Sequence, residues 1–338
     1  MYRLILVFFL LLTACVNRPS IVPQVDASPS VTATTTSSPT TTVTETPIPT
    51  ATFTPVPTFI PTSTFTPVPT FIPTPNENGS LNCFGSVALM YHRVLPEAPE
   101  IADGIGINSD LGSFERVLSY LVDNDYYFPT PSEFALDVEN GVCLHKYAII
   151  IIDDSWNDPE AMGVTKVLEM YGGGNADGSP KVWLAVITRM MAPFTTINGN
   201  QIASWVHLKQ MREEGLVYSV SHSQTHPAGL INTSEVYDPV NDPVYSKIAG
   251  ELGQSRQDIL ELTGEEPLFF VYPGGNVTQV ISSRIKSNGY FGAFTVTPGS
   301  LNGAYANYLP RINGGYGCNR TVESNSQCVI GKIEEYTK

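Results

Sequence analysis

The chain has 338 residues, with 32 acidic against 18 basic side chains and a formal net charge of −14. This balance argues against a nucleic-acid partner, because no basic stripe is available to neutralise phosphates. A neutral or cationic polymer is compatible with such a charge, which also favours solubility.

The N-terminal segment predicts an export signal. Arg3 supplies a positive charge, and residues 4–12 form an unbroken apolar run that is too short to span a bilayer. The following segment Leu12-Thr13-Ala14-Cys15 resembles the lipobox of bacterial lipoproteins. That resemblance implies a signal peptide over residues 1–14, a lipid on Cys15, and an exported protein anchored to the cell membrane. An ordinary signal peptide with an incidental cysteine is the alternative.

Residues 15–80 predict a disordered linker. The segment is rich in Thr, Ser and Pro, and the sequence TFTPVPTFIPT occurs at 52–62 and again at 64–74. Prolines at this density remove backbone donors and fix φ, and little apolar surface is present to offset the entropy of ordering. We therefore expect a spacer between membrane and domain; a segment that docks on the cell wall is the alternative.

Strand-like and helix-like patterns alternate through residues 81–338, which form the predicted domain. Strands are expected at 86–91, 148–152, 182–187, 216–220, 269–272 and 291–296. A helix capped by Ser113 is expected, with Phe114, Val117, Leu118 and Leu121 on its apolar face. Further helices are expected at 159–171, 205–214, 247–262 and 278–288. This alternation predicts an α/β fold with a parallel sheet or barrel, in which chemistry lies at the C-terminal ends of the strands.

Four cysteines remain if Cys15 carries lipid. An even number in an exported protein favours disulfides, and the four allow three connectivities. Cys318 and Cys328 are close in sequence and could close a small loop, which would leave Cys83 to pair with Cys143. Free buried thiols are the alternative.

Two carboxylates and two histidines follow neighbouring predicted strands. Asp153 and Asp154 end the apolar run 148–152, where an unpaired pair of charges would be costly and a metal ion would offset that cost. His222 and His226 are four residues apart, which lets both imidazoles face one side of a helical turn. Two histidines and a carboxylate form a ligand set that suits zinc, or another divalent transition metal, and leaves positions open. A helix cap is the rival reading of the aspartates.

Three motifs in order resemble those of the NodB-homology polysaccharide deacetylases, also called carbohydrate esterase family four. Ile151-Ile152-Asp153-Asp154-Ser155 resembles Thr-Phe-Asp-Asp-Gly, and His222-Ser223-Gln224-Thr225-His226 fits His-Ser/Thr-x-x-His. Val271-Tyr272-Pro273-Gly274-Gly275 is similar to the third motif. The resemblance implies a distorted (β/α) barrel of the NodB type.

The start and end of the domain resemble one branch of that family. Ala88-Leu89-Met90-Tyr91-His92-Arg93-Val94 resembles the Met-Tyr-His opening of the circularly permuted branch, which includes poly-N-acetylglucosamine deacetylases. Leu309-Pro310-Arg311-Ile312 is similar to another element of that branch. The implied activity is metal-dependent removal of N-acetyl groups from an extracellular N-acetylhexosamine polysaccharide, either an exopolysaccharide or peptidoglycan. An O-acetyl polysaccharide esterase and a degenerate, glycan-binding lipoprotein are the alternatives.

The resemblance assigns a role to each matching residue. Asp153 corresponds to the general base, His92 to the general acid of the permuted branch, Arg311 to a residue that orients Asp153, and the Gly274 N–H to an oxyanion donor. Asp154, His222 and His226 correspond to the metal ligands. The implied ion is zinc, with cobalt, nickel and manganese as alternatives.

The sequence also departs from the family pattern. Ser155 replaces a glycine and could narrow the site, and the arginine expected ahead of Tyr272 is absent unless Arg311 supplies it. No histidine follows His226, so the late Leu-x-His acid of the non-permuted family is missing and His92 is left for that role. His145 and His207 lie outside the motifs, and we expect surface or packing roles for them.

Overall fold

The computed structural model describes residues 75–96, 108–155, 158–191, 196–197, 200–226, 250–275, 277–315 and 322–338. The predicted signal peptide, Cys15 and both linker repeats lie outside these ranges. The described residues belong to one compact unit, Pro67–Lys338. They begin ahead of the predicted domain boundary, and Leu81 N donates to Ala304 O at 2.8 Å. Among the described residues, no helix combines the length and apolarity needed to cross a bilayer.

A seven-stranded sheet with the order β10-β9-β8-β5-β4-β1-β11 forms the centre of the domain, and every pairing within it is parallel. Its strands are β1 (Val87–Tyr91), β4 (Ala148–Ile152), β5 (Val182–Val186), β8 (Val217–Ser221), β9 (Phe269–Val271), β10 (Gly292–Phe294) and β11 (Ile312–Asn313). The pairs β2 (Val94–Leu95) with β3 (Ser109–Asp110) and β6 (Thr196–Ile197) with β7 (Asn200–Gln201) lie outside it. All six predicted strands are confirmed to within two residues at each end, whereas β11 was not predicted.

The helices are α1 (Leu111–Asp123), α2 (Pro131–Asn140), α3 (Val164–Met170), α4 (Trp205–Glu213), α6 (Ser255–Thr263), α7 (Gln279–Ser282) and α8 (Val322–Thr337). A π-helical turn, Gly250–Gln254, precedes α6. Two predicted boundaries were wrong for identifiable reasons. Helix α1 is capped by Asp110, whose side chain accepts from Ser113 N, and α3 starts late because Gly163 adopts a left-handed φ of 81°. The expected helix at 278–288 is only one turn of α7 followed by a 3-10 turn at Lys286–Asn288.

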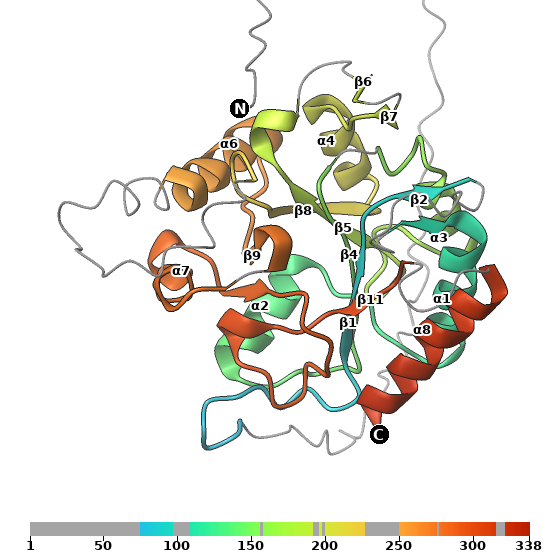
Figure 1. Ribbon diagram of the computed structural model, residues 1–338, viewed down its shortest axis with the longest axis horizontal. Coiled ribbons are helices and arrows are strands. Elements are labelled where there is room, and N and C mark those ends of the chain that lie inside the picture. The colour runs from blue at the N-terminus through green and yellow to red at the C-terminus, as the bar shows by residue number, and fades with distance from the viewer. Residues whose placement is uncertain are drawn as a thin grey trace, which may run out of the picture. The chain divides into compact units, whose positions relative to one another are not determined.

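The sheet curls because one short segment contacts both of its edges. Leu309 forms a parallel bridge with Phe294 of β10, and Ile312, three residues later, pairs with Leu89 of β1. The two edges of the sheet, β10 and β11, are thereby linked. Figure 1 shows β11 beside β1 in the central sheet. The predicted distorted (β/α) barrel is confirmed as a parallel sheet curled into a half-barrel.

Alternate residues of each strand point to two different cores. Ile150 and Ile152 pack with helices α1, α3, α4 and α8 on one face, while Ile149 and Ile151 join the core on the other. Phe134 of α2 fills that second face and stacks on Phe269 at a centroid distance of 5.2 Å. Because both faces are covered, β4 is buried throughout, as its continuous apolar run predicts.

A disulfide joins Cys83 and Cys143, so the start of the domain is tied to the segment after α2. This is one of the pairings left open by the sequence. Cys328 is also disulfide-bonded, while Cys318 lies outside the described residues.

Candidate active site

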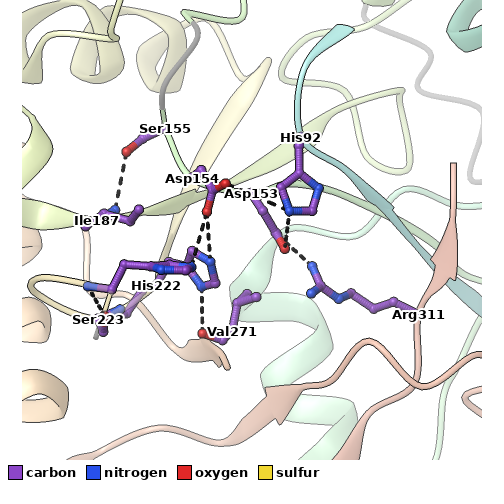
Figure 2. Close-up of polar contacts among 11 residues, drawn as sticks. His92, Asp153, Asp154, Ser155, Ile187, His222, Ser223, Val271 and Arg311 are labelled. Atoms are coloured by element: carbon purple, nitrogen blue, oxygen red, sulfur yellow. Dashed lines mark hydrogen bonds and ion pairs between the residues drawn. The ribbon is translucent and has the colours of Figure 1, made fainter. Parts of the chain in front are cut away.

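Polar side chains gather where the central strands end. Asp153 and Asp154 follow β4, His222 follows β8, and His92 follows β1. Figure 2 shows these four side chains pointing toward one another, with Arg311 reaching Asp153 from the segment before β11. The carboxyl ends of adjacent parallel strands thus bring residues far apart in sequence to one edge of the sheet.

Asp154, His222 and His226 offer ligand atoms that all lie within 4.8 Å of one another. Oδ1 of Asp154 is 3.2 Å from Nε2 of His222 and 3.5 Å from Nε2 of His226. Tetrahedral zinc with ligands at roughly 2.0–2.1 Å places adjacent ligand atoms about 3.3 Å apart. The two measured separations fit that edge length.

The hydrogen bond on the far side of His222 determines which atom faces Asp154. Nδ1 of His222 lies 2.8 Å from the carbonyl oxygen of Val271, which can only accept, so Nδ1 carries the proton. In the neutral ring, Nε2 then presents a lone pair to a carboxylate oxygen. Asp154 Oδ1 is itself buried without a hydrogen-bond donor.

Two acceptors at this separation repel each other unless a positive charge lies between them. Either a proton on His222 or a cation in the centre supplies it. Burial opposes protonation of His222, yet Asp154 and Asp153 raise its pKa above the usual range. Burial likewise opposes ionisation of Asp154, and the three nearby histidines lower its pKa to about 2. The residues therefore fit a divalent ion. This fit rests on the hydrogen bond that turns Nε2 of His222 toward the centre and on Asp154 Oδ1, which is buried without a hydrogen-bond donor.

The backbone around the site is strained. Asp154, Ser155, Ser223 and His226 are four of the five non-glycine residues with positive φ among the described positions, at 78°, 49°, 69° and 51°. Such conformations cost on the order of 1–3 kcal/mol each and persist where the surrounding structure holds them. The expected helical turn at 222–226 was wrong, because the two histidines converge through left-handed bends in a loop.

Ser155 does not narrow the site in the way its replacement of glycine suggested. Its side chain is buried and accepts a hydrogen bond from Ile187 N at 3.3 Å, beyond the end of β5. In Figure 2 it points away from His92 and Asp153. The hydroxyl therefore anchors the left-handed turn after Asp154.

Asp153 is held by a buried ion pair. Nη1 of Arg311 donates to Oδ1 of Asp153 at 2.6 Å, and Nε of Arg311 donates to Thr295 O at 2.7 Å. Both side chains are almost fully buried. Burial would raise the pKa of Asp153, but Arg311, His222 and His92 outweigh it and hold that pKa below its usual value. Arg311 thus supplies a positive charge that orients and balances Asp153.

His92 faces both carboxylates without bonding to either. Its Nε2 lies 3.9 Å from Asp153 Oδ2 and 3.9 Å from Asp154 Oδ2, beyond hydrogen-bond range. Burial lowers the pKa of His92, and the two carboxylates partly oppose that effect. The ring therefore lies beside the site with Nε2 directed at the space between the two acids.

Glu251 holds the loop of residues 222–226, called here the histidine loop. The motifs do not reveal this contact. Its carboxylate accepts from Gln224 N at 2.9 Å, Thr225 N at 2.8 Å and Thr225 Oγ1 at 2.7 Å. The side chain is buried in the π-helical turn before α6. Glu251 lies 26 residues after Thr225 in the chain, so no local pattern could have found this contact.

Asp158 and His207 lie outside the ligand set, and each has a separate structural role. Asp158, not the pair Asp153 and Asp154, caps the next turn by accepting from Glu160 N at 2.9 Å and Ala161 N at 3.3 Å. His207 lies between Asp158 and Glu160 and contacts both carboxylates. Although burial opposes it, these carboxylates raise the pKa of His207. This histidine therefore has an ion-pairing role.

His145 and Gly274 are the two remaining residues that the sequence analysis named, and they lie in different segments of the chain. His145 stacks on Tyr127 at a centroid distance of 4.2 Å, which confirms the expected packing role. Gly274 lies in the turn Pro273–Gly275 after β9, has a left-handed φ of 63° and is exposed. Its turn follows Val271, the residue whose carbonyl orients His222.

A family model described as polysaccharide deacetylase matches residues 183–293. The matched segment contains His222, His226 and Gly274, whereas Asp153 and Arg311 lie on either side of it. No curated protein sequence matches the chain.

Several solved structures share the fold. IcaB from Ammonifex degensii is 22% identical, with 75% of this chain and 99% of that chain covered and a TM-score of 0.54. Streptococcus pyogenes deacetylase PplD in complex with acetate is 19% identical, with 72% and 97% covered and a TM-score of 0.54. A de-N-acetylase from Aggregatibacter actinomycetemcomitans is 18% identical, with 71% and 99% covered and a TM-score of 0.52. Residues 183–293 thus carry the sequence pattern of the polysaccharide deacetylase family, and the domain built around them has the NodB-type fold of these solved proteins.

Proposed function

We propose that this protein is a metal-dependent hydrolase that removes N-acetyl groups from an extracellular N-acetylhexosamine polysaccharide, either an exopolysaccharide or peptidoglycan. The observation that carries the proposal is the convergence of Asp154, His222 and His226, with acceptor atoms facing one another. The family match and the shared fold support deacetylation of a polysaccharide. The printed name of one relative, a de-N-acetylase, supports the N-acetyl group as the target.

Asp154, His222 and His226 would hold the divalent ion, with zinc as the favoured metal and cobalt, nickel or manganese as alternatives. When bound, such an ion supplies Lewis-acid polarisation of the acetyl carbonyl and of water. The Nδ1–H of His222 keeps its bond to Val271 O, which fixes the ring so that Nε2 stays directed at the centre.

Asp153 acts as the general base. Its Oδ1 is occupied by Arg311, and its Oδ2 faces the side of the site where His92 lies. The low pKa keeps the carboxylate ionised and ready to accept a proton from the attacking water. Arg311 positions this carboxylate and does not need to contact substrate.

His92 protonates the departing nitrogen, because an amide anion is too poor a leaving group to depart unaided. Its Nε2 is the atom directed toward the two carboxylates, from where a proton bound to it can pass to the departing nitrogen. The N–H of Gly274 donates to the oxyanion that develops on the acetyl carbonyl. A histidine at the end of β1 also accords with the permuted branch of the family.

We further propose that the protein is exported and anchored to the cell membrane by lipid on Cys15, with residues 15–80 as a spacer. The lipobox-like segment supports the anchor. The Cys83–Cys143 disulfide supports an oxidising compartment outside the cytosol.

An acetate-release assay tests this function. The purified protein is incubated with N-acetylated and O-acetylated glycans, with and without a chelator. We expect acetate from N-acetylhexosamine polymers, loss of that activity with chelator, and recovery on adding zinc. Release from O-acetylated glycans alone would make the protein an esterase. Glycan binding without acetate release on any substrate would make it a lectin and refute the proposal.

Glu251→Gln should lower the affinity for the metal, because the carboxylate of Glu251 holds the histidine loop by three hydrogen bonds. An amide offers one oxygen where the carboxylate accepts three hydrogen bonds, so His226 is held less firmly. Outer partners of this kind typically change metal affinity by about 10- to 100-fold. Zinc titration of chelator-treated protein measures it.

Glu261→Gln is the matched control, because it is the same substitution at an exposed position of α6, where the carboxylate accepts a hydrogen bond from Gln257 Nε2. If both variants bound zinc as tightly as the parent protein, Glu251 would have no role in placing the ligands.

A further inference from the structure

A cavity of about 660 Å³ lies at the end of the sheet opposite the candidate active site. Phe291 lines it and directly precedes β10, so the cavity is at the amino ends of the parallel strands. Asp153 and His222, by contrast, follow the carboxyl ends of β4 and β8. Ligand pockets have volumes of roughly 300–1,000 Å³, and this cavity falls within that range. The proposed reaction makes no use of it.

Aromatic side chains form much of the cavity wall. They are Tyr290, Phe291, Tyr305 and Tyr308. Tyr305 is 50% exposed and Tyr308 is 45% exposed, so solvent and ligands can reach both rings. Tyr308 Oη donates to Ser282 Oγ at 2.7 Å, which holds that ring in place. A preformed aromatic surface binds with little loss of conformational entropy.

The charges at the cavity are balanced. Glu139 and Lys286 line it, are both exposed and carry opposite signs. The other lining side chains, which include Val138 and Asn307, are neutral. A ligand with a large net charge of either sign would meet repulsion as well as attraction there. The lining therefore favours an uncharged and largely apolar ligand.

The chain enters the domain beside this cavity. Pro75, the first described residue, packs on Gly141, where an added Cβ would lie 3.1 Å from Pro75 Cβ. Gly141 caps α2 and follows the lining residue Val138 by one turn. Further along, Leu81 N donates at 2.8 Å to Ala304 O, directly before the lining segment 305–308. The entering chain thus passes next to two walls of the cavity.

The sequence directly before Pro75 suits such a cavity. Residues 67–74 read Pro-Val-Pro-Thr-Phe-Ile-Pro-Thr and carry no charge. Proline-rich segments lose little conformational entropy on binding, and aromatic-lined surfaces commonly recognise them. Phe71 is four residues before Pro75, and four extended residues span at most about 14 Å. Its ring can therefore enter a cavity that lies beside Pro75.

We propose that residues 67–74 bind in this cavity of the same chain. Phe71 packs against Tyr305 and Tyr308, and the prolines of the segment lie along the aromatic wall. The linker is thereby held at the amino ends of the strands, so the candidate active site is directed away from it. This binding does not depend on the proposed hydrolysis.

The two linker repeats provide a comparison within one chain. Phe59 of the first repeat has the same neighbours as Phe71 of the second, but it is sixteen residues before Pro75. Effective concentration falls roughly as the −3/2 power of the length of the connecting chain, so a fourfold greater length favours the second repeat about eightfold. The two repeats should therefore behave differently, although their sequences are identical.

Nuclear magnetic resonance of the purified full-length protein tests the docking. Phe59 and Phe71, like Ile60 and Ile72, share their local sequence, so their signals should coincide if neither repeat is bound. We expect separate signals, with those of the second repeat shifted by the tyrosine rings. The backbone order parameter should be above about 0.6 at Phe71 and below about 0.6 at Phe59.

Tyr305→Ala and Tyr308→Ala should each bring the signals of the second repeat back toward those of the first. These variants also separate docking from mere closeness to the domain, because closeness alone would leave the difference unchanged. Phe84→Ala is the matched control on the domain, since Phe84 is 72% exposed and does not line the cavity. Thermal melting checks that each variant folds.

Phe71→Ala and Phe59→Ala form a second matched pair, in the linker itself. The first should release Ile72 and the second should leave its signal in place. Coincident signals of the two repeats in the parent protein would overturn the proposal, as would a difference that survives in both tyrosine variants. A difference that disappears on dilution would make the linker of a second copy the occupant, and would equally refute binding within one chain.

Discussion

Asp153→Asn should lower kcat by about a thousandfold or more while the divalent-ion content stays unchanged. A positioned general base contributes typically 10²–10⁴-fold, and asparagine has the shape of aspartate but cannot take up the proton. Asp154, His222 and His226 remain in place, so metal binding is preserved. Steady-state kinetics of acetate release and metal analysis of the same preparation measure the two quantities.

Asp177→Asn provides the control for this change, because it is the same substitution at an exposed position outside the candidate active site. Its kinetics should match those of the parent protein. If Asp153→Asn kept full activity, the base would have to be another group. If it lost its metal as well as its activity, Asp153 would be a ligand.

His92→Ala should lower kcat by about a hundredfold or more, with a much smaller effect on metal occupancy. His92 Nε2 lies 3.9 Å from the nearest oxygen of each carboxylate and does not bond to them, so the ligand set does not depend on it. The loss should be largest for amides and smaller for activated esters, because an ester leaving group needs less help from an acid. Comparison of acetamide and acetate ester substrates measures this difference.

His145→Ala is the matched histidine control, since the ring of His145 packs on Tyr127 and Tyr147. Equal loss of metal and activity in His92→Ala would assign His92 to the metal. An equal loss on amides and esters would remove its role as the proton donor to nitrogen.

The sequence was sufficient for the strands and for the place of the chemistry. A parallel strand buried on both faces needs an unbroken apolar run, and residues 148–152 have one. Polar residues directly after such a strand must lie at its carboxyl end. Asp154 and His222 could therefore be expected to meet once β4 and β8 were recognised as strands of one sheet, separated by β5.

Contacts between distant segments were beyond the reach of local patterns. Glu251 holds the histidine loop across a gap in sequence, and nothing beside it marks that role. The left-handed bends at Ser223 and His226 replaced the expected helical turn, because residue spacing alone does not distinguish a helix from a loop held by tertiary contacts. Strand β11 has only two residues and no alternation to detect, yet it forms one edge of the sheet, and Leu309 just before it bridges to β10 at the other edge.

Gly163, inside the helix predicted at 159–171, shows a second limit of prediction from sequence. A run from Pro159 onward has a helical pattern, but the left-handed φ of Gly163 delays the helix until Val164. Glycine in a helical pattern is compatible with either outcome, since its conformation is set by its surroundings.

Metal analysis of the purified protein, with chelator-treated protein titrated by zinc, tests the central claim most directly. We expect one ion per chain in the parent protein and in Asp153→Asn. His222→Ala and Asp154→Ala should each bind zinc at least a hundredfold more weakly, because two of three protein ligands cannot close the site. Zinc affinity that is unchanged in both ligand variants would contradict the claim that these side chains share one ion.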